Sequence, residues 1–346
     1  MNPPPPTLSV VIPVFNVEAF IEECLDSLLK QDFADWEAVV VDDHGDDASM
    51  DHVRRVAETD ARIRIIDHGM NRGLGAARNT GVEHARGGYV LFLDSDDTFT
   101  EGTLAAVAAE LSKRPVDILI FDHVRQYPSG RRKHSKNRQR FRDAPQQFTA
   151  ATFPEVLNAL AIAPGKAFSR DALARVDIDF PSGSYEDIPW TFVMLAVARH
   201  ISWLDHLGYV YRQRPIGSIL NTSSRKHFDI HAQYRLLFAR LDRPDVAKLV
   251  VDRIYSTVSR HLWLVASPVT DRIADADRPD FIRASRGTLW AIRPSFGSWL
   301  REWKQPRHAA LATGSVIAYR SVRAVIKRRR KVLKALAARG KTHSLS

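Results

Sequence analysis

The sequence predicts an α/β protein with a mainly parallel sheet and helices on both faces, followed by a helical C-terminal region. Two observations support this prediction. From residue 8 to 121, short and nearly continuous apolar runs alternate with amphipathic helix-like stretches, which is the pattern of parallel strands buried on both faces. From about residue 225 onward, apolar residues recur at helical spacing, as at Val250, Ile254 and Val258.

The predicted elements follow one another in a regular order. The expected strands are the β-branched runs 8–12, 38–41, 63–66, 89–93 and 117–121. The expected helices are 18–30, about 49–58, 74–86 and 103–113. At 124–142 a strand, a Pro-Ser-Gly turn and a basic return segment predict a hairpin, either merely solvated or forming a basic surface that faces an acceptor. The pieces at 150–215 are expected to complete the same domain.

Length and composition suit one large domain or two smaller ones, because 346 residues with 45% hydrophobic and 26% charged side chains are ordinary for globular proteins. We expect a disordered Pro-rich N-terminus at 1–7, a large domain at 8–220, a helical region at 221–306 and a basic amphipathic tail at 307–346. The helical region would suit a subunit interface in a homo-oligomer.

Cysteine content and hydropathy indicate the compartment. Cys24 is the one cysteine, so an intrachain disulfide and a cysteine-based metal cluster are excluded. The sequence shows neither a secretion signal nor an uncharged apolar run of about 18 residues. A cytoplasmic protein is therefore expected, at most peripheral at the inner face of the membrane.

The formal charge of +10 is concentrated near the C-terminus. Twelve lysines and arginines follow Glu302 and no acid does, so residues 1–302 carry a net charge of −2 by difference. The stretch 316–336 has the composition of a basic interfacial helix. Contact with an anionic membrane, binding of a polyanionic polymer and packing against its own fold or another subunit all stay open for it. A nucleic-acid partner is not expected, because no nucleic-acid module accompanies the tail.

Acidic pairs follow two of the predicted strands. Asp94 and Asp96 come after the run 89–93, and Asp42 and Asp43 come after 38–41. Because the carboxyl ends of parallel strands form the ligand-binding edge of such sheets, we expect these four carboxylates to converge. Converging carboxylates need a cationic partner, and Mg2+ or Mn2+ bound together with a diphosphate would supply it. A turn or helix cap is the simpler reading of one Asp-x-Asp by itself.

Three further motifs carry candidate chemistry. The segment 71–79 superficially resembles a dinucleotide fingerprint, but it follows the third strand and places Arg78 where a small residue should stand, so a dehydrogenase is rejected. Arg78 is expected to face phosphate or the acidic cluster. Asp187, near a helix start, would either cap that helix or take a proton from an acceptor hydroxyl. Arg212 and Arg214 would either lie over a diphosphate or be surface charges.

The chain resembles the inverting glycosyltransferases of family two. The motifs that carry the resemblance occur in the family's order and are Ser9–Asn16, Val41–Asp43, Gly73–Asn79, Leu93–Asp97 and Tyr185–Asp187. The resemblance covers roughly residues 8–215 and implies the GT-A fold and a nucleotide-sugar donor, with UDP as the expected nucleotide. Where members often continue Asp-Asp-Gly-Ser, this chain has His44 and Gly45 after its two acids, which leaves that turn undefined.

The resemblance also implies roles for single residues. Asp96 would ligate Mn2+ or Mg2+, and Asp187 would be the catalytic base. Pro13, Phe15 and Asp43 would line the nucleobase pocket. The full set expected to bind the nucleotide sugar is Pro13, Phe15, Asn16, Asp43, Arg78, Asp94, Ser95, Glu186 and Arg212.

The resemblance therefore implies a metal-dependent hexosyl- or N-acetylhexosaminyltransferase that acts on a hydroxyl of a cell-surface glycopolymer or related saccharide. The segments 165–168 and 209–212 resemble those of enzymes that build or decorate bacterial surface polymers such as teichoic acids and capsules. A nucleotidyl or polyol-phosphate transferase is one alternative, disfavoured because Pro13–Asn16 stands where a glycine-rich phosphate loop would be. A non-catalytic carbohydrate- or membrane-associated module is the other, and it would not need Asp96 and Asp187 in one cleft.

Overall fold

A computed structural model describes residues 4–159, 161–214 and 223–328. These residues divide into two compact units. The first comprises the described residues up to 214 together with 236–253, and the second comprises 223–235 together with 254–328. The two helices α8 and α9 each pass from one unit to the other. The domain boundaries expected from the sequence stay a prediction.

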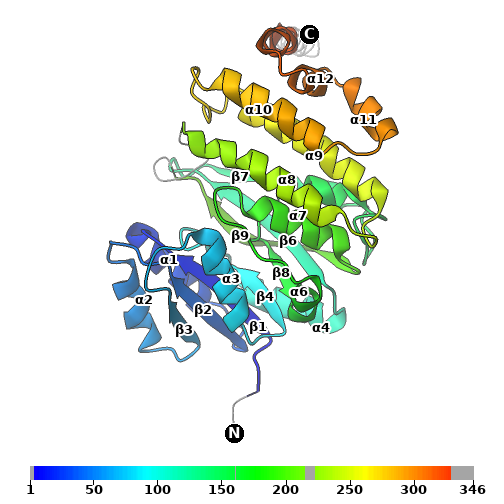
Figure 1. The fold of residues 1–346 in the computed structure, drawn as a ribbon. Helices are drawn as coiled ribbons and strands as arrows, with labels where there is room; N and C mark the ends of the chain where they lie inside the picture. The colour runs from blue at the N-terminus through cyan, green and yellow to red at the C-terminus, as the bar shows by residue number, and fades with distance from the viewer. Residues whose placement is uncertain (1–3, 160, 215–222, 329–346) are drawn as a thin grey trace, which may run out of the picture. The chain divides into compact units, whose positions relative to one another are not determined.

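The first unit is built on one nine-stranded sheet (Figure 1). Its strands are β1 (Leu8–Val14), β2 (Trp36–Asp42), β3 (Ile63–Asp67), β4 (Tyr89–Phe92), β5 (Thr98–Phe99), β6 (Ile118–Gln126), β7 (Arg132–His134), β8 (Lys166–Ser169) and β9 (Ile201–Arg212). The strand order is β3-β2-β1-β4-β8-β6-β9-β5, and β7 pairs with β6. Each of the five predicted strands is present.

The sheet is parallel in its first half and mixed in its second. Strands β3, β2, β1 and β4 are all parallel, as the apolar runs predict. Strand β8 lies antiparallel between β4 and β6, whereas β6 and β9 are again parallel. The antiparallel insertion was not foreseen, because β8 is supplied by a segment far downstream of β4.

Helices cover both faces of this sheet. They are α1 (Glu18–Leu29), α2 (Ser49–Ala57), α3 (Leu74–His84), α4 (Thr103–Lys113), α5 (Asn137–Arg140), α6 (Arg170–Val176) and α7 (Asp187–Val197), with a 3-10 turn η1 (Pro154–Asn158). Val10 and Ile12 of β1 belong to the main core cluster with residues of α1 and α4. Val11 points to the other face, where a Cβ added to Gly81 of α3 would lie 2.2 Å from its Cγ1. Glycine at 81 therefore lets α3 pack closely on β1.

The predicted hairpin at 124–142 is present. The end of β6 pairs antiparallel with β7, and the N–H of Gly130 donates to the Tyr127 carbonyl at 2.9 Å across the turn. After β7 the chain forms the short helix α5.

The C-terminal region is helical, as predicted. It contains η3 (Arg225–Phe228), α8 (Asp229–Leu241), α9 (Lys248–Val265), α10 (Arg278–Ala291), α11 (Phe296–Trp303) and α12 (Pro306–Ala312), and residues 316–328 form a further helix. Among the described helices, none has both the length and the apolar composition to cross a bilayer.

The basic tail packs in part against its own unit. Within the helix 316–328, the Tyr319 hydroxyl donates to the Ala266 carbonyl at 2.8 Å, and its ring lies 4.6 Å from that of Trp263. Ile317 and Val325 of the same helix are exposed. The rest of the stretch predicted as an interfacial helix, 329–336, lies outside the described residues, and its membrane or polymer contact stays a prediction.

Candidate active site

The motifs that follow β1, β2 and β4 lie together at one edge of the sheet. Strand β1 is parallel to both neighbours. Its Val14 carbonyl accepts from the N–H of Asp43 at 2.9 Å, and its Val11 carbonyl accepts from the N–H of Leu93 at 3.0 Å. The acidic motifs at 42–43 and 94–97 therefore begin side by side, as the parallel topology predicts.

Asp43 organises the loop that leads into α3. Its carboxylate accepts from the backbone N–H groups of Arg72 at 2.8 Å and Gly73 at 2.9 Å. His68 Nδ1 lies 2.9 Å from the same carboxylate, and the amide of Asn71 donates to the Asp43 carbonyl at 3.2 Å. The side chain is buried, so the structure shows Asp43 as a brace of the loop. A direct contact between Asp43 and a nucleobase stays a prediction.

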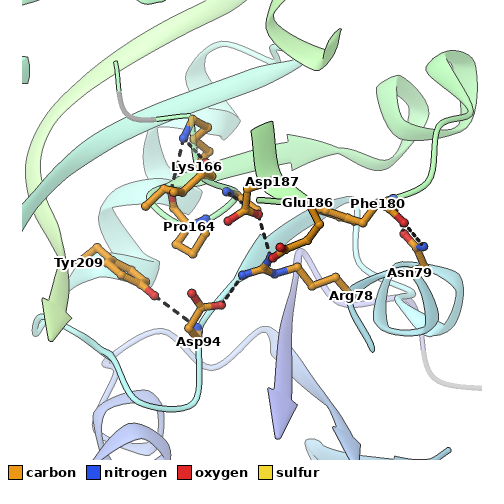
Figure 2. Close-up of polar contacts among 11 residues, drawn as sticks. Arg78, Asn79, Asp94, Pro164, Lys166, Phe180, Glu186, Asp187 and Tyr209 are labelled. Atoms are coloured by element: carbon orange, nitrogen blue, oxygen red, sulfur yellow. Dashed lines mark hydrogen bonds and ion pairs between the residues drawn. The ribbon is translucent and has the colours of Figure 1, made fainter. Parts of the chain in front are cut away.

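Arg78 lies at the centre of the site and contacts three carboxylates (Figure 2). Its Nη1 donates to Glu186 Oε1 and to Asp187 Oδ1, both at 2.8 Å. Its Nη2 donates to Asp94 Oδ1 at 2.7 Å. One fully buried guanidinium therefore joins the acid that follows β4 to the two acids at the start of α7. The sequence left phosphate and the acidic cluster open as partners of Arg78, and the structure shows Arg78 bound to the acidic cluster.

This cluster contains more acid than base, and burial changes its protonation. Burial raises the pKa of Asp187 to about 7, although Arg78 opposes the rise, and Glu186 and Asp94 add to it. Burial also raises the pKa of Glu186. Because the Asp187 side chain is still 16% exposed, a solute can reach it. A carboxyl group that titrates near neutral pH and remains accessible is suited to accept a proton from a hydroxyl.

The turn before β8 supports Asp187 from the other side. The N–H of Ala163 donates to Asp187 Oδ1 at 3.4 Å. The buried Lys166 ammonium donates to the carbonyls of Ile162 at 2.5 Å and Pro164 at 3.4 Å (Figure 2). Burial lowers the pKa of Lys166 to about 8, and Asp187 opposes this shift. The positive charge of Lys166 thus lies beside the acidic cluster, and its ammonium N–H groups stabilise the turn at residues 162–164.

The end of β9 is fastened to the acidic run 94–97. The Tyr209 hydroxyl and the N–H of Arg212 donate to the two carboxylate oxygens of Asp97, each at 2.7 Å. Arg214 Nε lies 2.8 Å from Asp96 Oδ2, and Arg212 Nε donates to the Asp96 carbonyl at 2.8 Å. Burial raises the pKa of Asp96, which Arg214 opposes, and raises that of Asp97 well above its usual range. Arg212 and Arg214 thus both contact the acidic run 94–97, so they are more than solvated surface charges.

Divalent metal fits this site when a substrate supplies part of the coordination. Among the described residues, no three His, Cys, Asp or Glu side chains are grouped to hold an ion. Mg2+ in nucleotide sites is commonly held by one or two carboxylates and by phosphate oxygens. The Asp96 carboxylate is 17% exposed and its pKa is raised by burial, so a cation near it would relieve an unfavourable charge. Its role as a metal ligand stays a prediction.

The other predicted donor-binding residues occupy the same edge. Pro13 is buried in β1, whereas Phe15 has a ring that is 47% exposed. Asn16 has a positive φ of 49°, and its Oδ1 accepts from the N–H of Asp46 at 2.9 Å. Asp46 directly follows His44 and Gly45, the turn that the family resemblance left undefined. Ser95, which stands between Asp94 and Asp96 in the sequence, is buried.

Some residues of the site carried no assigned role in the sequence. Lys166 belongs to a segment noted for its resemblance, and only the fold places it beside Asp187. Asn79 forms a reciprocal pair with Phe180: the Asn79 amide donates to the Phe180 carbonyl at 3.0 Å, and the Phe180 N–H donates to Asn79 Oδ1 at 2.8 Å. The signal that points to Asn79 is its place directly after Arg78.

Comparison with known proteins identifies the family. The fold and this acidic edge define a glycosyltransferase of the GT-A class. A family model described as glycosyl transferase family 2 matches residues 9–176. The uncharacterized glycosyltransferase EpsJ of Bacillus subtilis is 33% identical over 242 residues, which cover 66% of this chain and 67% of that protein. The chain belongs to glycosyl transferase family 2.

A longer match links the chain to the poly(ribitol-phosphate) beta-N-acetylglucosaminyltransferase TarS of Staphylococcus aureus. The two are 28% identical over 296 residues, which cover 82% of this chain but 49% of TarS. This chain thus spans about half the length of that relative. The crystal structure of S. aureus TarS 1-349 with UDP-GlcNAc has a TM-score of 0.78 at 24% identity, covering 93% of this chain and 92% of that one.

A more distant structure shares the fold. The crystal structure of GalNAc-T7 with UDP, GalNAc and Mn2+ has a TM-score of 0.51 at 15% identity and covers 74% of this chain and 51% of that one. At such identities the two structural matches show the fold alone, and it is the GT-A-like fold that the sequence predicts.

Proposed function

We propose that this chain transfers a hexose or N-acetylhexosamine from a UDP-sugar to a hydroxyl of a cell-surface glycopolymer, with inversion at the anomeric carbon. The observation that supports it best is the Arg78 bridge, because one guanidinium holds Asp94 on the donor side and Asp187 on the acceptor side. The relative TarS is named for N-acetylglucosamine transfer to poly(ribitol phosphate), which supports this donor and this class of acceptor.

The donor would lie along the carboxyl ends of β1, β2 and β4. The exposed ring of Phe15 offers an aromatic face to a nucleobase, beside the loop that Asp43 braces. Asp94 is 25% exposed and uses Oδ1 for Arg78, so its Oδ2 is left for a ribose hydroxyl. Arg212 and Arg214 lie beside Asp96, where their charges would oppose the negative charge of the diphosphate.

The acceptor step is a single displacement. The acceptor oxygen forms a bond to the anomeric carbon while the bond from that carbon to the diphosphate oxygen breaks, and its electron pair leaves with the nucleoside diphosphate. Asp187 takes the proton of the attacking hydroxyl, which requires its ionised form. Arg78 and the N–H of Ala163 hold one carboxylate oxygen, Oδ1, so the other is oriented for the substrate.

A divalent cation would add electrostatic stabilisation of the leaving diphosphate. In this chain Asp96 would hold it together with the phosphate oxygens of the donor. The presence of Mn2+ in the GalNAc-T7 structure of similar fold supports this assignment.

Donor binding and transfer can be tested separately. We would measure binding and turnover of UDP-, GDP-, CDP- and dTDP-sugars with Mn2+ or Mg2+ for the native chain and for Asp187→Asn. The variant is expected to bind the donor normally and to lose roughly 100-fold or more in transfer. Asp171→Asn, an exposed acid in the first turn of α6, is the matched control and should behave like the native chain.

Two outcomes would contradict the proposal. Failure of every donor to bind with either metal would indicate the non-catalytic module. Release of a phosphoryl- or nucleotidyl-modified acceptor, rather than a glycoside, would indicate the nucleotidyl or polyol-phosphate transferase.

A further inference from the structure

One segment of the first unit has an unusual charge. Residues 124–142, here called the basic hairpin, contain eight lysines and arginines and no acid. Because residues 1–302 together carry −2, the rest of that stretch carries −10 once the basic hairpin is set aside. A cationic surface set within an otherwise acidic stretch of the chain attracts anions over distances comparable to the Debye length of roughly 8–10 Å at physiological salt.

The side chains of the basic hairpin are held in place without being neutralised. The Arg125 guanidinium lies 5.9 Å from the centre of the Tyr211 ring, and that of Arg131 lies 4.2 Å from the Tyr127 ring. Arg132 Nε donates to the amide oxygen of Gln126 at 3.1 Å. Aromatic rings and amides order a cation while leaving its charge for a ligand.

Acids take little part in ordering this surface. In the described part of the chain, the one ion pair of the basic hairpin joins Arg138 Nε to Asp205 at 2.7 Å, and both of these side chains are more than half exposed. The remaining basic side chains keep their charge for a partner outside the chain.

The basic hairpin adjoins the proposed acceptor side of the active site. Along one edge of β6, the N–H of Phe121 donates to Gly165 in the turn that contacts Asp187, at 3.1 Å. Two residues further along that strand, the carbonyl of His123 accepts from the N–H of Ser135 of the basic hairpin at 3.2 Å. Two residues of a strand span about 7 Å.

The other edge of β6 leads to the donor side. Gln126 pairs with Arg212 of β9, and the N–H of Gln213 donates to the Gln126 carbonyl at 2.8 Å. A linear molecule whose reacting unit lies at Asp187 therefore has the basic hairpin within reach of its next units.

We propose that the basic hairpin binds the phosphates of a phosphodiester-linked polyol polymer whose hydroxyl is the acceptor. This inference rests on the proposed function and names the chemistry of its acceptor. Repeating phosphates match a row of cations, and binding to flanking units would raise the local concentration of hydroxyls at Asp187. A bilayer is the weaker partner, because no large apolar side chain of the basic hairpin is exposed for insertion in the described structure.

The test compares two variants that each lose three positive charges. The first is Arg131→Gln/Arg132→Gln/Lys133→Gln, all exposed on the basic hairpin. The matched control is Lys30→Gln/Arg55→Gln/Lys113→Gln, all exposed on other surfaces of the first unit. Equilibrium binding of labelled poly(ribitol phosphate) is measured at about 50 and about 200 mM salt, with donor hydrolysis recorded in parallel.

We expect the hairpin variant to lose roughly tenfold or more in polymer affinity and part of its salt dependence, as when cations that contact a polyanion are removed. Its donor hydrolysis should stay at the native rate, and the control should match the native chain in both assays. Unchanged polymer binding by the hairpin variant would overturn the inference. So would a native chain that hydrolyses donor but does not bind the polymer, a result that leaves the proposed function intact.

Two further probes separate other polyanions. Vesicles with about one third phosphatidylglycerol, and single-stranded RNA of matched charge, are tested under the same conditions. If either binds more tightly than the polymer, and that binding is lost in the hairpin variant, the basic hairpin is a membrane or nucleic-acid surface and the inference is wrong.

Discussion

Removing the Arg78 guanidinium is the most direct perturbation of the site. In Arg78→Met, an unbranched apolar side chain replaces the cation that Asp94, Glu186 and Asp187 share at 2.7 to 2.8 Å. Arg78 is fully buried, so solvent cannot take its place. The three carboxyl groups are then left without their common partner.

The magnitude follows from the cost of leaving buried charge unpaired, which is about 3–5 kcal/mol when one partner of a buried pair is removed. Protonation of a carboxyl group removes its buried charge and so lowers this cost. In the native chain the pKa of Asp187 is already about 7, so this protonation takes place close to neutral pH. Loss of Arg78 raises the pKa of Glu186 and of Asp187 further, so the folded variant binds more protons than its unfolded form. Its free energy of unfolding must therefore fall as pH rises.

The assay is urea unfolding of the native chain and the variant at about pH 6 and about pH 8. The variant's loss of unfolding free energy should approach about 3–5 kcal/mol at the higher pH and be smaller at the lower pH. Arg283→Met is the matched control. Arg283 is 63% exposed and pairs with the exposed Asp280, so its loss should cost less than about 1 kcal/mol at either pH. A loss of that small size for Arg78→Met, or one that does not grow with pH, would refute this reasoning.

Three further predictions concern the reaction and the fold. Because Asp187 accepts a proton only when ionised and its pKa is about 7, kcat/KM for the acceptor should fall about tenfold per pH unit below about pH 7 and level off above it; a flat profile down to about pH 5 would rule out this base. Asp96→Ala should remove the effect of added Mn2+ on donor affinity, measured by calorimetry with and without the metal, and an unchanged metal effect would reject Asp96 as its ligand. Gly81→Ala should destabilise the chain by up to about 2 kcal/mol, since overpacking against Val11 costs about 1–3 kcal/mol and helix propensity returns about 1 kcal/mol. Gly287→Ala, in α10 with open space around it, should be neutral or stabilising in the same urea titration, and equal effects of the two changes would contradict the packing argument.

The order of elements and the edge that carries the chemistry could be predicted from the sequence. Alternation of apolar runs with amphipathic stretches is a local property, and it predicted β1 to β4, β6 and the helices α1 to α4. Parallel strands place their carboxyl ends together, so the acids after β2 and β4 were expected to meet. These conclusions required only periodicity and the geometry of parallel sheets.

The partners of the charged side chains were decided by the tertiary structure. The sequence showed that Asp42, Asp43, Asp94 and Asp96 need a positive partner and assigned it to a metal diphosphate. The fold also provides backbone N–H groups for Asp43 and one arginine each for Asp94 and Asp96. These contacts join residues that are about 16 to about 118 positions apart in the sequence.

Burial was likewise decided by the fold. Asp187 was recognised by its place in a motif, but its pKa near 7 arises from desolvation and from Glu186 beside it, which depend on how α7 packs. Lys166 gained its place beside Asp187 because β8 inserts between β4 and β6. A sequence determines which side chains are available and on which local element they lie, while long-range packing sets the distances and the dielectric environment that turn them into a site.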